Sequence, residues 1–343
     1  MSLELNSEGS NIGRPESKKK ISANRISFIS LMLGFLALWL AFFILYRTFP
    51  YLSSGSSVVY RAKIQREMNG EVFPEDTDLE RILIFGDSKV LAGFVPDLFD
   101  NLASSDGIRL TSYNSGYPGL TTFVPELTGM IKHGQVPNVL LLTSPWKAGS
   151  QHFNPFKMVE NDHDMAEDLF PFRYLIRDTF SFLITSREHG GPWRFYRECR
   201  DNVRKMVRDR GYYFISEQSH FTGNSLPDNF KLPSDQPDRI RSRNGDSEAD
   251  ELHELNQLIV QNGIHCYYVP SYLRQGEAAQ PPAVDEAFAQ LLRNHSKCNL
   301  LGPDYFIYPN KIFSDEAHLN PEGARIYTES LYQLLSSSLH RDR

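Results

Sequence analysis

The sequence predicts an α/β fold with a parallel β-sheet, preceded by one membrane-spanning helix. Short apolar runs that end in turn residues alternate with segments whose apolar residues recur at helical spacing. Such β-α-β-α-β alternation implies right-handed crossovers and therefore a parallel sheet. A separate apolar stretch, residues 26–46, contains no charged side chain. These observations predict one anchored α/β domain.

The composition limits the function classes. A chain of 343 residues can form one sizeable domain with appendages. The net charge of −6 argues against nucleic acid as a partner. Three cysteines, Cys199, Cys266 and Cys298, are too few for a disulfide framework, and their spacing fits no zinc motif. At most one disulfide could form, with one thiol left over. We expect three small buried residues as the simpler interpretation.

Residues 26–46 are expected to form a retained transmembrane helix after a disordered polar tail, residues 1–25. As a helix the stretch is about 31 Å long, close to the ~30 Å of a bilayer core. A buried soluble helix fits poorly, because no face is polar. A cleaved signal peptide would have an apolar region of about 7–15 residues and a small-x-small site. Residues 47–51 are not such a site.

The charges beside this stretch predict its orientation. Lys18, Lys19, Lys20 and Arg25 precede it, so the amino terminus is expected in the cytoplasm. The chain after Arg47 is then expected to face the periplasm or the cell exterior. Residues 47–79 contain Ser-Ser-Gly-Ser-Ser and a polar stretch, which indicates a tether.

The predicted α/β domain spans residues 80–340 and opens with a strand over 81–86. The next helix follows Ser88, and Pro96 is expected to kink it or delay its start. A second strand over 110–113 leads into a glycine-bearing loop, residues 114–121. Further elements are predicted in order: a helix marked by Phe123, Leu127 and Ile131, and a third strand over 139–143.

Residues 147–246 interrupt this alternation and are expected to form a helical insertion over the strand ends. Helices are predicted near 170–186 and 192–209, followed by a loop over 224–246. The second helix carries an apolar stripe (Tyr196, Cys199, Val203, Met206) and a basic stripe (Arg197, Arg200, Arg204, Arg208). A solvated charged face is the simpler interpretation of the basic stripe. The alternative is contact with an anionic polymer or phospholipid headgroups, and the insertion is a candidate lid or docking region.

The alternation then resumes to the end of the domain. A helix over 247–262, a strand over 264–269, a helix over 284–294 and a strand over 298–301 are predicted in turn. Asn320 as N-cap and Pro321 at the first helical position start the last helix. With five parallel strands, we expect a flavodoxin-like three-layer sandwich.

Three short blocks carry residues suited to nucleophilic catalysis. Ser88 follows a strand at its carboxyl end, where open α/β sheets place ligands and nucleophiles. Asp315 and His318 are three residues apart, so the carboxylate can orient the imidazole that accepts the serine proton. N–H groups of the 114–121 loop could face a developing oxyanion. Taken singly, the same residues are a turn serine, a surface aspartate and a helix-capping histidine.

No metal or cofactor is expected. No third or fourth ligand lies near Asp315 and His318 in the sequence, as a zinc site would need. The polar run at residues 161–164, Asn-Asp-His-Asp, is most simply a solvated turn.

The order of the three blocks resembles that of the SGNH/GDSL hydrolase superfamily. They are Gly86-Asp87-Ser88, an Asn-x-x-x-x-Gly-x-Thr block from Asn114 to Thr121, and Asp315-x-x-His318. The resemblance implies a catalytic set of Ser88, Asp315 and His318, with the N–H groups of Ser88 and Gly119 as oxyanion donors. The family's usual third-block asparagine is replaced by Thr143-Ser144-Pro145-Trp146. Asn114 could substitute for it or could cap its own turn.

Within the superfamily, the layout resembles membrane-anchored proteins that transfer acyl groups to cell-envelope polymers. Examples are the D-alanyl transfer protein of teichoic acid synthesis and the alginate and exopolysaccharide O-acetylation proteins. The resemblance implies a serine esterase or O-acyltransferase acting on acyl esters of envelope polysaccharide, with a membrane-bound O-acyltransferase as a further partner. The alternatives are a non-catalytic envelope scaffold of the same fold and a lipase-like or phospholipase-like esterase.

Overall fold

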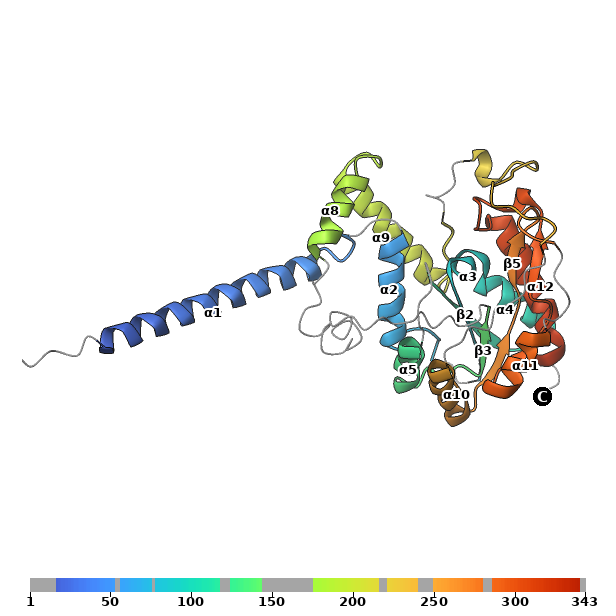
Figure 1. The fold of residues 1–343 in the computed structure, drawn as a ribbon, viewed down its shortest axis with the longest axis horizontal. Helices are drawn as coiled ribbons and strands as arrows, with labels where there is room; N and C mark the ends of the chain where they lie inside the picture. Colours follow the sequence, from blue (N-terminus) through green and yellow to red (C-terminus); the bar gives the residue numbers. More distant parts are fainter. Residues whose placement is uncertain are drawn as a thin grey trace, which may run out of the picture. The chain divides into compact units, whose positions relative to one another are not determined.

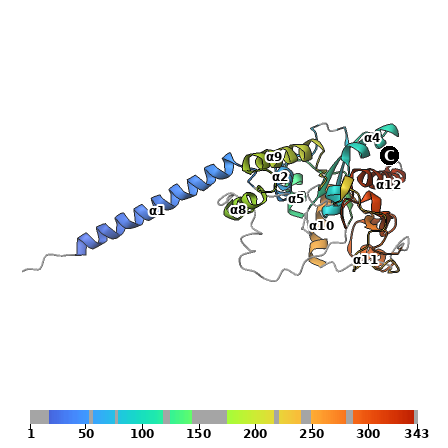
Figure 2. The same cartoon turned by 90° about the horizontal axis from the view of Figure 1, so that it is seen from above.

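The structure is a computed structural model that describes residues 17–52, 56–75, 78–117, 124–143, 175–215, 221–239, 249–279 and 286–339. The chain divides into two compact units. One comprises residues 1–50 and 155–177, and the other comprises residues 51–154 and 178–343. Figure 1 follows the chain by colour, and Figure 2 shows the same elements from above.

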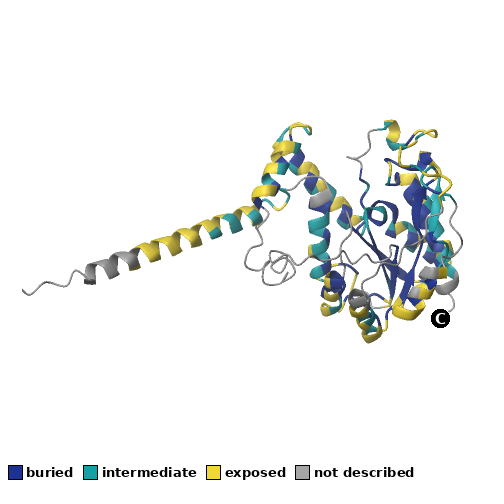
Figure 3. Ribbon diagram, viewed as in Figure 1, coloured by how far each residue is buried: buried dark blue, intermediate teal, exposed yellow. Residues whose placement is uncertain are grey.

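The first unit contains the long helix α1 (Ser17–Thr48), which starts earlier than the sequence predicts. Its segment Ser27–Thr48 has a mean hydropathy of 2.6, and none of it is buried. Large apolar side chains such as Phe28, Leu31 and Leu33 are therefore exposed along it (Figure 3). Among the described residues this is the one helix long and apolar enough to cross a membrane.

The second unit is built on a five-stranded parallel sheet, as predicted. Its strands lie in the order β2-β1-β3-β4-β6. They are β1 (Glu80–Gly86), β2 (Leu110–Gly116), β3 (Val139–Leu142), β4 (His265–Tyr268) and β6 (Asn299–Leu300). In the register Gly86 lies beside Gly116, and Phe85 lies beside Leu142. The carboxyl ends of the first three strands therefore meet at one edge.

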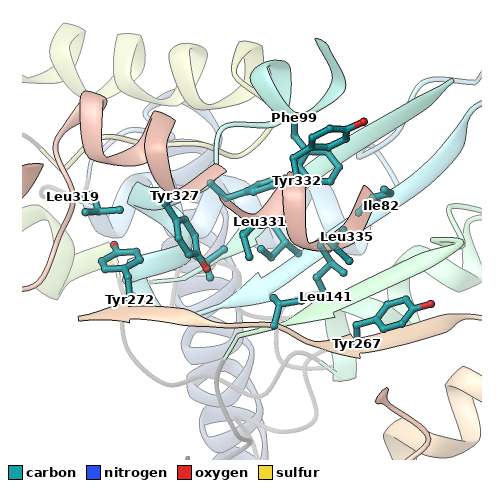
Figure 4. Packing of buried hydrophobic residues seen from close by; sticks show 14 of the residues in the cluster. Ile82, Phe99, Leu141, Tyr267, Tyr272, Leu319, Tyr327, Leu331, Tyr332 and Leu335 are labelled. Atoms are coloured by element: carbon teal, nitrogen blue, oxygen red, sulfur yellow. The ribbon is translucent and has the colours of Figure 1, made fainter. Parts of the chain in front are cut away.

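Several helices of the second unit pack on alternate residues of these strands. The described helices after α1 are α2 (Ser56–Met68), α3 (Ser88–Gly93), α4 (Pro96–Ser105), α5 (Val124–Lys132), α8 (Leu175–Thr185), α9 (Pro192–Arg208), α10 (Ala249–Asn262), α11 (Glu286–His295) and α12 (Pro321–Leu339). Helix α8 begins in the first unit, which includes residues up to Arg177, and continues in the second. Ile82 and Leu141 pack with residues of α4 and α12 (Figure 4). Leu83 and Leu140 pack with α5, α10 and α11 instead, because successive strand residues point to opposite faces.

The predicted tether is wrong over α2. Val58 and Val59 of this helix are buried against α9, and its Lys63 and Glu67 are fully buried. Lys63 and Glu67 lie one turn apart on the same side as Val59, so α2 presents this whole side to the interior. The second unit thus begins at Tyr51.

Two other elements differ from the predicted ones near the sheet. Strand β2 continues to Gly116, so Asn114 lies in a strand and not in a loop. After Pro270 the chain continues as β5 (Ser271–Arg274), which pairs in parallel with β7 (Tyr305–Tyr308) to form a second small sheet that was not predicted. The break expected at Pro96 is present, because this proline begins α4 after α3 has ended.

The interrupting segment contains the two predicted helices, α8 and α9. Residues 144–174, 216–220 and 240–248 lie outside the described residues, and with them the 161–164 run. Helix α9 buries Phe195, Cys199, Val203 and Met206. The short 3₁₀ turns η2 (Thr222–Asn224) and η3 (Asn310–Ile312) complete the described elements.

The three cysteines are buried, as expected, and two of them form the single bridge that the sequence left open. Cys266 and Cys298 form a disulfide across 32 residues of sequence, with a Cα–Cα distance of 4.4 Å. Cys266 lies in β4 and Cys298 precedes β6, which pairs with β4. Pairing of these strands brings the two thiols together, which sequence spacing does not indicate. The third cysteine, Cys199, is buried, as expected.

Removal of this disulfide is expected to destabilise the second unit. In the chain-entropy description, a cross-link that closes a loop of this length restricts the unfolded chain by about 3–4 kcal/mol. We therefore expect Cys266→Ala/Cys298→Ala to lower the free energy of unfolding by up to that amount, measured by urea titration in detergent. Dithiothreitol is expected to destabilise the parent chain and the control Cys199→Ala, but not the double variant. Equal midpoints for parent and double variant would contradict the argument.

Candidate active site

Ser88 is placed by a tight corner between β1 and α3. An added Cβ at Gly86 would lie 2.3 Å from Thr143 Oγ1, and one at Gly116 would lie 2.2 Å from the Leu91 backbone nitrogen. The absence of both side chains lets α3 pack directly on the strand ends. Asp87 is the N-cap of α3 and accepts a 2.8 Å hydrogen bond from the Lys89 N–H. Ser88 is the first helical residue, half-buried at the carboxyl edge of the sheet.

His318 is held by a closed turn between η3 and α12. Phe313 and Leu319 form an antiparallel bridge, and the Ser314 N–H donates to the His318 carbonyl at 2.8 Å. Asn320 caps α12 by accepting a 3.0 Å bond from the Gly323 N–H, as the sequence predicts. The imidazole therefore lies on a backbone that is fixed on both sides.

Asp315 holds both the backbone and the ring of His318. Its Oδ1 accepts hydrogen bonds from the Ala317 N–H at 2.8 Å and from the His318 N–H at 2.7 Å. Its Oδ2 lies 2.9 Å from His318 Nδ1. A carboxylate only accepts, so the proton of this contact belongs to Nδ1 and leaves Nε2 as an acceptor.

The structure brings Ser88 to the free nitrogen of this ring. Ser88 Oγ lies 2.8 Å from His318 Nε2, across 230 residues of sequence. With Nδ1 protonated, the serine hydroxyl donates to Nε2, which is the arrangement in which a histidine can accept the serine proton. The three side chains that the sequence predicts to meet are therefore within hydrogen-bond distance in one row.

The pKa of Asp315 is lowered below its usual value. Burial alone would raise this pKa, but it is outweighed by the His318 ring, through its hydrogen bond and its charge, and by the N–H groups of Ala317 and His318. Asp315 is therefore ionised near neutral pH, as required of a group that orients and stabilises an imidazolium.

Contacts between α3, α12 and β5 maintain the separation of Ser88 and His318. Lys89 Nζ donates to the Tyr272 carbonyl at 2.8 Å, and the Tyr272 hydroxyl donates back to the Lys89 carbonyl at 2.9 Å. The Thr328 hydroxyl of α12 accepts from the Val95 N–H at 3.0 Å, and its single proton lies between the Ala324 carbonyl at 2.8 Å and the Gly93 carbonyl at 3.2 Å. Helix α3 is thus bonded to β5, and α12 is bonded to the end of α3.

Asn114 is not placed as the oxyanion donor that the sequence suggested. Its side chain is fully buried, and its amide nitrogen donates to the carbonyls of Val90 and Phe94 at 2.8 and 2.7 Å. Its Oδ1 accepts from the Gly116 N–H at 2.9 Å, which matches the alternative of a residue that caps its own turn. No donor of this amide is left for a ligand, so its role is to join β2 to α3.

Of the other two predicted oxyanion donors, Ser88 is among the described residues and Gly119 is not. As the first residue of α3, Ser88 has an N–H outside the hydrogen-bond pattern of the helix itself. Gly119 lies outside the described residues, as do Ser144, Pro145 and Trp146 of the third block.

A buried polar cluster beneath α2 supports β2 near the site and was missed from the sequence. Lys63 Nζ donates to the Gly116 and Gly211 carbonyls at 2.7 and 2.9 Å and contacts Asn114 Oδ1 at 3.2 Å. Burial lowers the pKa of Lys63 to about 7, opposed in part by the charge of Glu67. Glu67 in turn accepts from Ser115 Oγ at 3.1 Å and from the Tyr117 hydroxyl. The polar pattern of α2 resembles a solvated tether, which is why these residues carried no signal.

Comparison of the chain with protein-family models, with curated proteins and with solved structures finds no match. Among the described residues, no group of three or more His, Cys, Asp or Glu side chains is arranged to hold a metal ion. In the described site, the Ser88 hydroxyl is within hydrogen-bond distance of the His318 imidazole, which in turn contacts the Asp315 carboxylate.

The lowered pKa of Asp315 predicts a pH-dependent contribution to stability. The unfolded-state pKa of aspartate is about 3.9, and the folded value is lower, so ionised Asp315 stabilises the fold fully above about pH 5. This contribution is lost as the pH falls through the folded value. We expect Asp315→Asn to lower the free energy of unfolding at pH 7, and the difference from the parent to shrink towards pH 3 in urea titrations. A difference that is independent of pH would contradict this, and the exposed Glu316→Gln is the control.

Proposed function

We propose that this chain is a serine esterase or O-acyltransferase that forms an acyl-serine intermediate at Ser88. The observation that carries the proposal is the 2.8 Å contact between Ser88 Oγ and His318 Nε2, with Asp315 on the opposite side of the ring. A chance serine–histidine pair would not need an ionised carboxylate on the second nitrogen.

The proposed reaction begins with attack of Ser88 Oγ on an ester carbonyl carbon while its proton passes to His318 Nε2. A C–O bond forms, and the carbonyl electrons move to an oxyanion that faces N–H groups. The intermediate collapses by breaking the bond to the leaving alcohol, which receives the proton from His318. Water or a sugar hydroxyl then attacks the acyl-serine by the same steps, giving an acid or a new ester and restoring Ser88.

We also propose the finer fold assignment, a flavodoxin-like three-layer sandwich of the SGNH/GDSL superfamily. The strand order β2-β1-β3-β4-β6 has the same pattern as the flavodoxin-like order 2-1-3-4-5. The two core clusters on alternate strand residues support a helical layer on each side. The position of Ser88 at the first strand end matches the place of ligands in such folds.

For the location, we propose a single-pass anchor with the second unit outside the cytoplasm, facing the periplasm or the cell exterior. Lys18, Lys19, Lys20 and Arg25 on the amino-terminal side of the apolar segment support this orientation. The Cys266–Cys298 disulfide supports it independently, since disulfides persist in oxidising compartments.

The substrate class follows from the resemblance of the motifs and of the anchored layout. We propose acyl esters of a cell-envelope polysaccharide, with a membrane-bound O-acyltransferase as a partner that supplies or receives the acyl group. A non-catalytic scaffold of the same fold is the second candidate. The observation that favours it is the absence of an asparagine at residues 143–146, because loss of one oxyanion donor costs about 3–4 kcal/mol.

Ser88→Ala is expected to lower the turnover of an activated acetyl ester by at least ~10³-fold, because it removes the attacking oxygen. A fluorophosphonate probe is expected to label the parent chain at Ser88 and to leave Ser88→Ala unlabelled. Ser314→Ala is the matched control, since the Ser314 hydroxyl lies nearby and donates to the His318 carbonyl, away from the imidazole nitrogens. Undiminished turnover in Ser88→Ala would refute the nucleophile, and a folded parent without any labelling would favour the scaffold.

The orientation is tested by fusing reporters to the chain. Alkaline phosphatase joined after residue 60 is expected to be active, because it folds only outside the cytoplasm, and a cytoplasmic reporter at the same position is expected to be inactive. Both reporters are first tested after residue 20 as a control for the opposite pattern. The reverse result at residue 60 would invert the proposed topology.

A further inference from the structure

Helix α8 has a second apolar side that the protein does not use for packing. On one side Phe182 is buried against Phe195 of α9, with ring centroids 5.1 Å apart. On the other side Phe180, Leu183 and Ile184 are 66%, 46% and 65% exposed. Their spacing of three and four residues places them on one face of the helix. Grouped exposed apolar side chains of this kind usually mark an interaction surface.

Helix α9 adds an exposed aromatic residue and a row of basic side chains. Trp193 is 72% exposed. Arg197, Arg200 and Arg204 follow it at helical spacing, away from the buried stripe of the same helix. Residues 187–208 contain seven basic and three acidic side chains, whereas the whole chain has a net charge of −6. The hairpin of α8 and α9, residues 178–208, is thus locally cationic as well as apolar.

The chain connects this hairpin closely to the apolar helix. Tyr51 is the third residue after Thr48, the last residue of α1, and three residues of chain reach at most about 11 Å. The Tyr51 ring packs edge-on against Tyr196 of α9, with centroids 5.6 Å apart. Only three residues of chain therefore join the end of α1 to the tyrosine that contacts α9.

We propose that the α8–α9 hairpin docks on the anionic phospholipid surface of the membrane that α1 crosses. The exposed apolar residues enter the boundary between headgroups and acyl chains, and the arginines bind lipid phosphates. This combination of Trp, Phe and Leu with a basic face is typical of helices that lie in a membrane interface. An anionic phosphate surface matches the excess of arginine on this face. The inference rests on α1 crossing a membrane and is independent of the proposed chemistry.

Docking at this hairpin would fix the candidate active site relative to the membrane. Helix α9 is followed by residues that bond directly to the elements around Ser88. The Tyr213 N–H donates to the Leu91 carbonyl of α3 at 3.0 Å, and the Asn114 N–H donates to the Arg210 carbonyl at 3.0 Å. Leu91 and Met206 also share one buried cluster. The docked hairpin is therefore linked to α3 by backbone hydrogen bonds and shared packing.

The test uses the full chain reconstituted into vesicles, with one nitroxide label at a time on an introduced cysteine. Ile184→Cys reports the proposed docked face. Leu36→Cys, on α1, is the immersed reference, and Val260→Cys, an exposed apolar residue of α10, is the aqueous reference. Cys199 is buried and Cys266 and Cys298 are paired, so the parent chain is the labelling blank. Accessibility to oxygen and to a water-soluble nickel complex is measured in phosphatidylcholine alone and with phosphatidylglycerol added.

The expected result is a label at Ile184→Cys that is accessible to oxygen and protected from nickel, as at Leu36→Cys, when phosphatidylglycerol is present. Replacing Arg197, Arg200 and Arg204 with glutamine is expected to lower the ratio of docked to undocked hairpin about fivefold for each arginine. A label at Ile184→Cys as accessible to nickel as that at Val260→Cys would overturn the proposal. Protection from both reagents, which indicates cover by another copy of the chain, would also overturn it. An aqueous label at Leu36→Cys would remove its premise.

Discussion

The candidate site depends on one constraint, the packing of α12 on the face of the sheet that Ile82 and Leu141 point to. Tyr327, Leu331 and Leu335 of this helix bury themselves against strand residues such as Ile82 and Leu141 (Figure 4). The burial of several large apolar side chains supplies several kilocalories per mole, far more than any single polar contact in the site. The chain segments that carry Ser88 and His318 each join this packed core within a few residues. The contact between the two side chains is therefore a consequence of core packing and is not itself what holds the segments together.

Polar groups then set the geometry within this frame. Buried charges are costly unless they are bonded, so those present in the interior restrict the local structure strongly. Asp315 accepts two backbone N–H groups and one ring nitrogen, which fixes the turn and the ring together. On the other side of the site, Lys63 joins the carbonyls of Gly116 and Gly211. The apolar core brings the segments near one another, and these hydrogen bonds determine their orientation.

The sequence was sufficient for the features that repeat or that carry a local signal. The apolar runs at residues 82–85 and 139–142 predicted buried parallel strands, and the Asn320-Pro321 pair predicted the start of α12. The meeting of Ser88 and His318 was expected from the order of the three sequence blocks, although His318 lies in the turn before α12 and not at a strand end. The remaining differences are non-local. Nothing near α2 in sequence indicates that Lys63 is buried, since its partners are 53 and 148 residues away. The same reason explains the missed disulfide and the small sheet of β5 and β7, whose strands are too short to show a period.

The disulfide lies at the β6 edge of the five-stranded sheet, where the pairing between strands is shortest. Strand β6 is two residues long and pairs only with β4, so few backbone bonds hold it. The disulfide lies beside this pairing and keeps β6 next to β4 even when the hydrogen bonds between the two strands open. When the two thiols are reduced, only the short pairing of β4 with β6 holds this edge of the sheet. Under the orientation proposed above, this link forms only after the domain has left the cytosol, so the last step of its folding follows its transport.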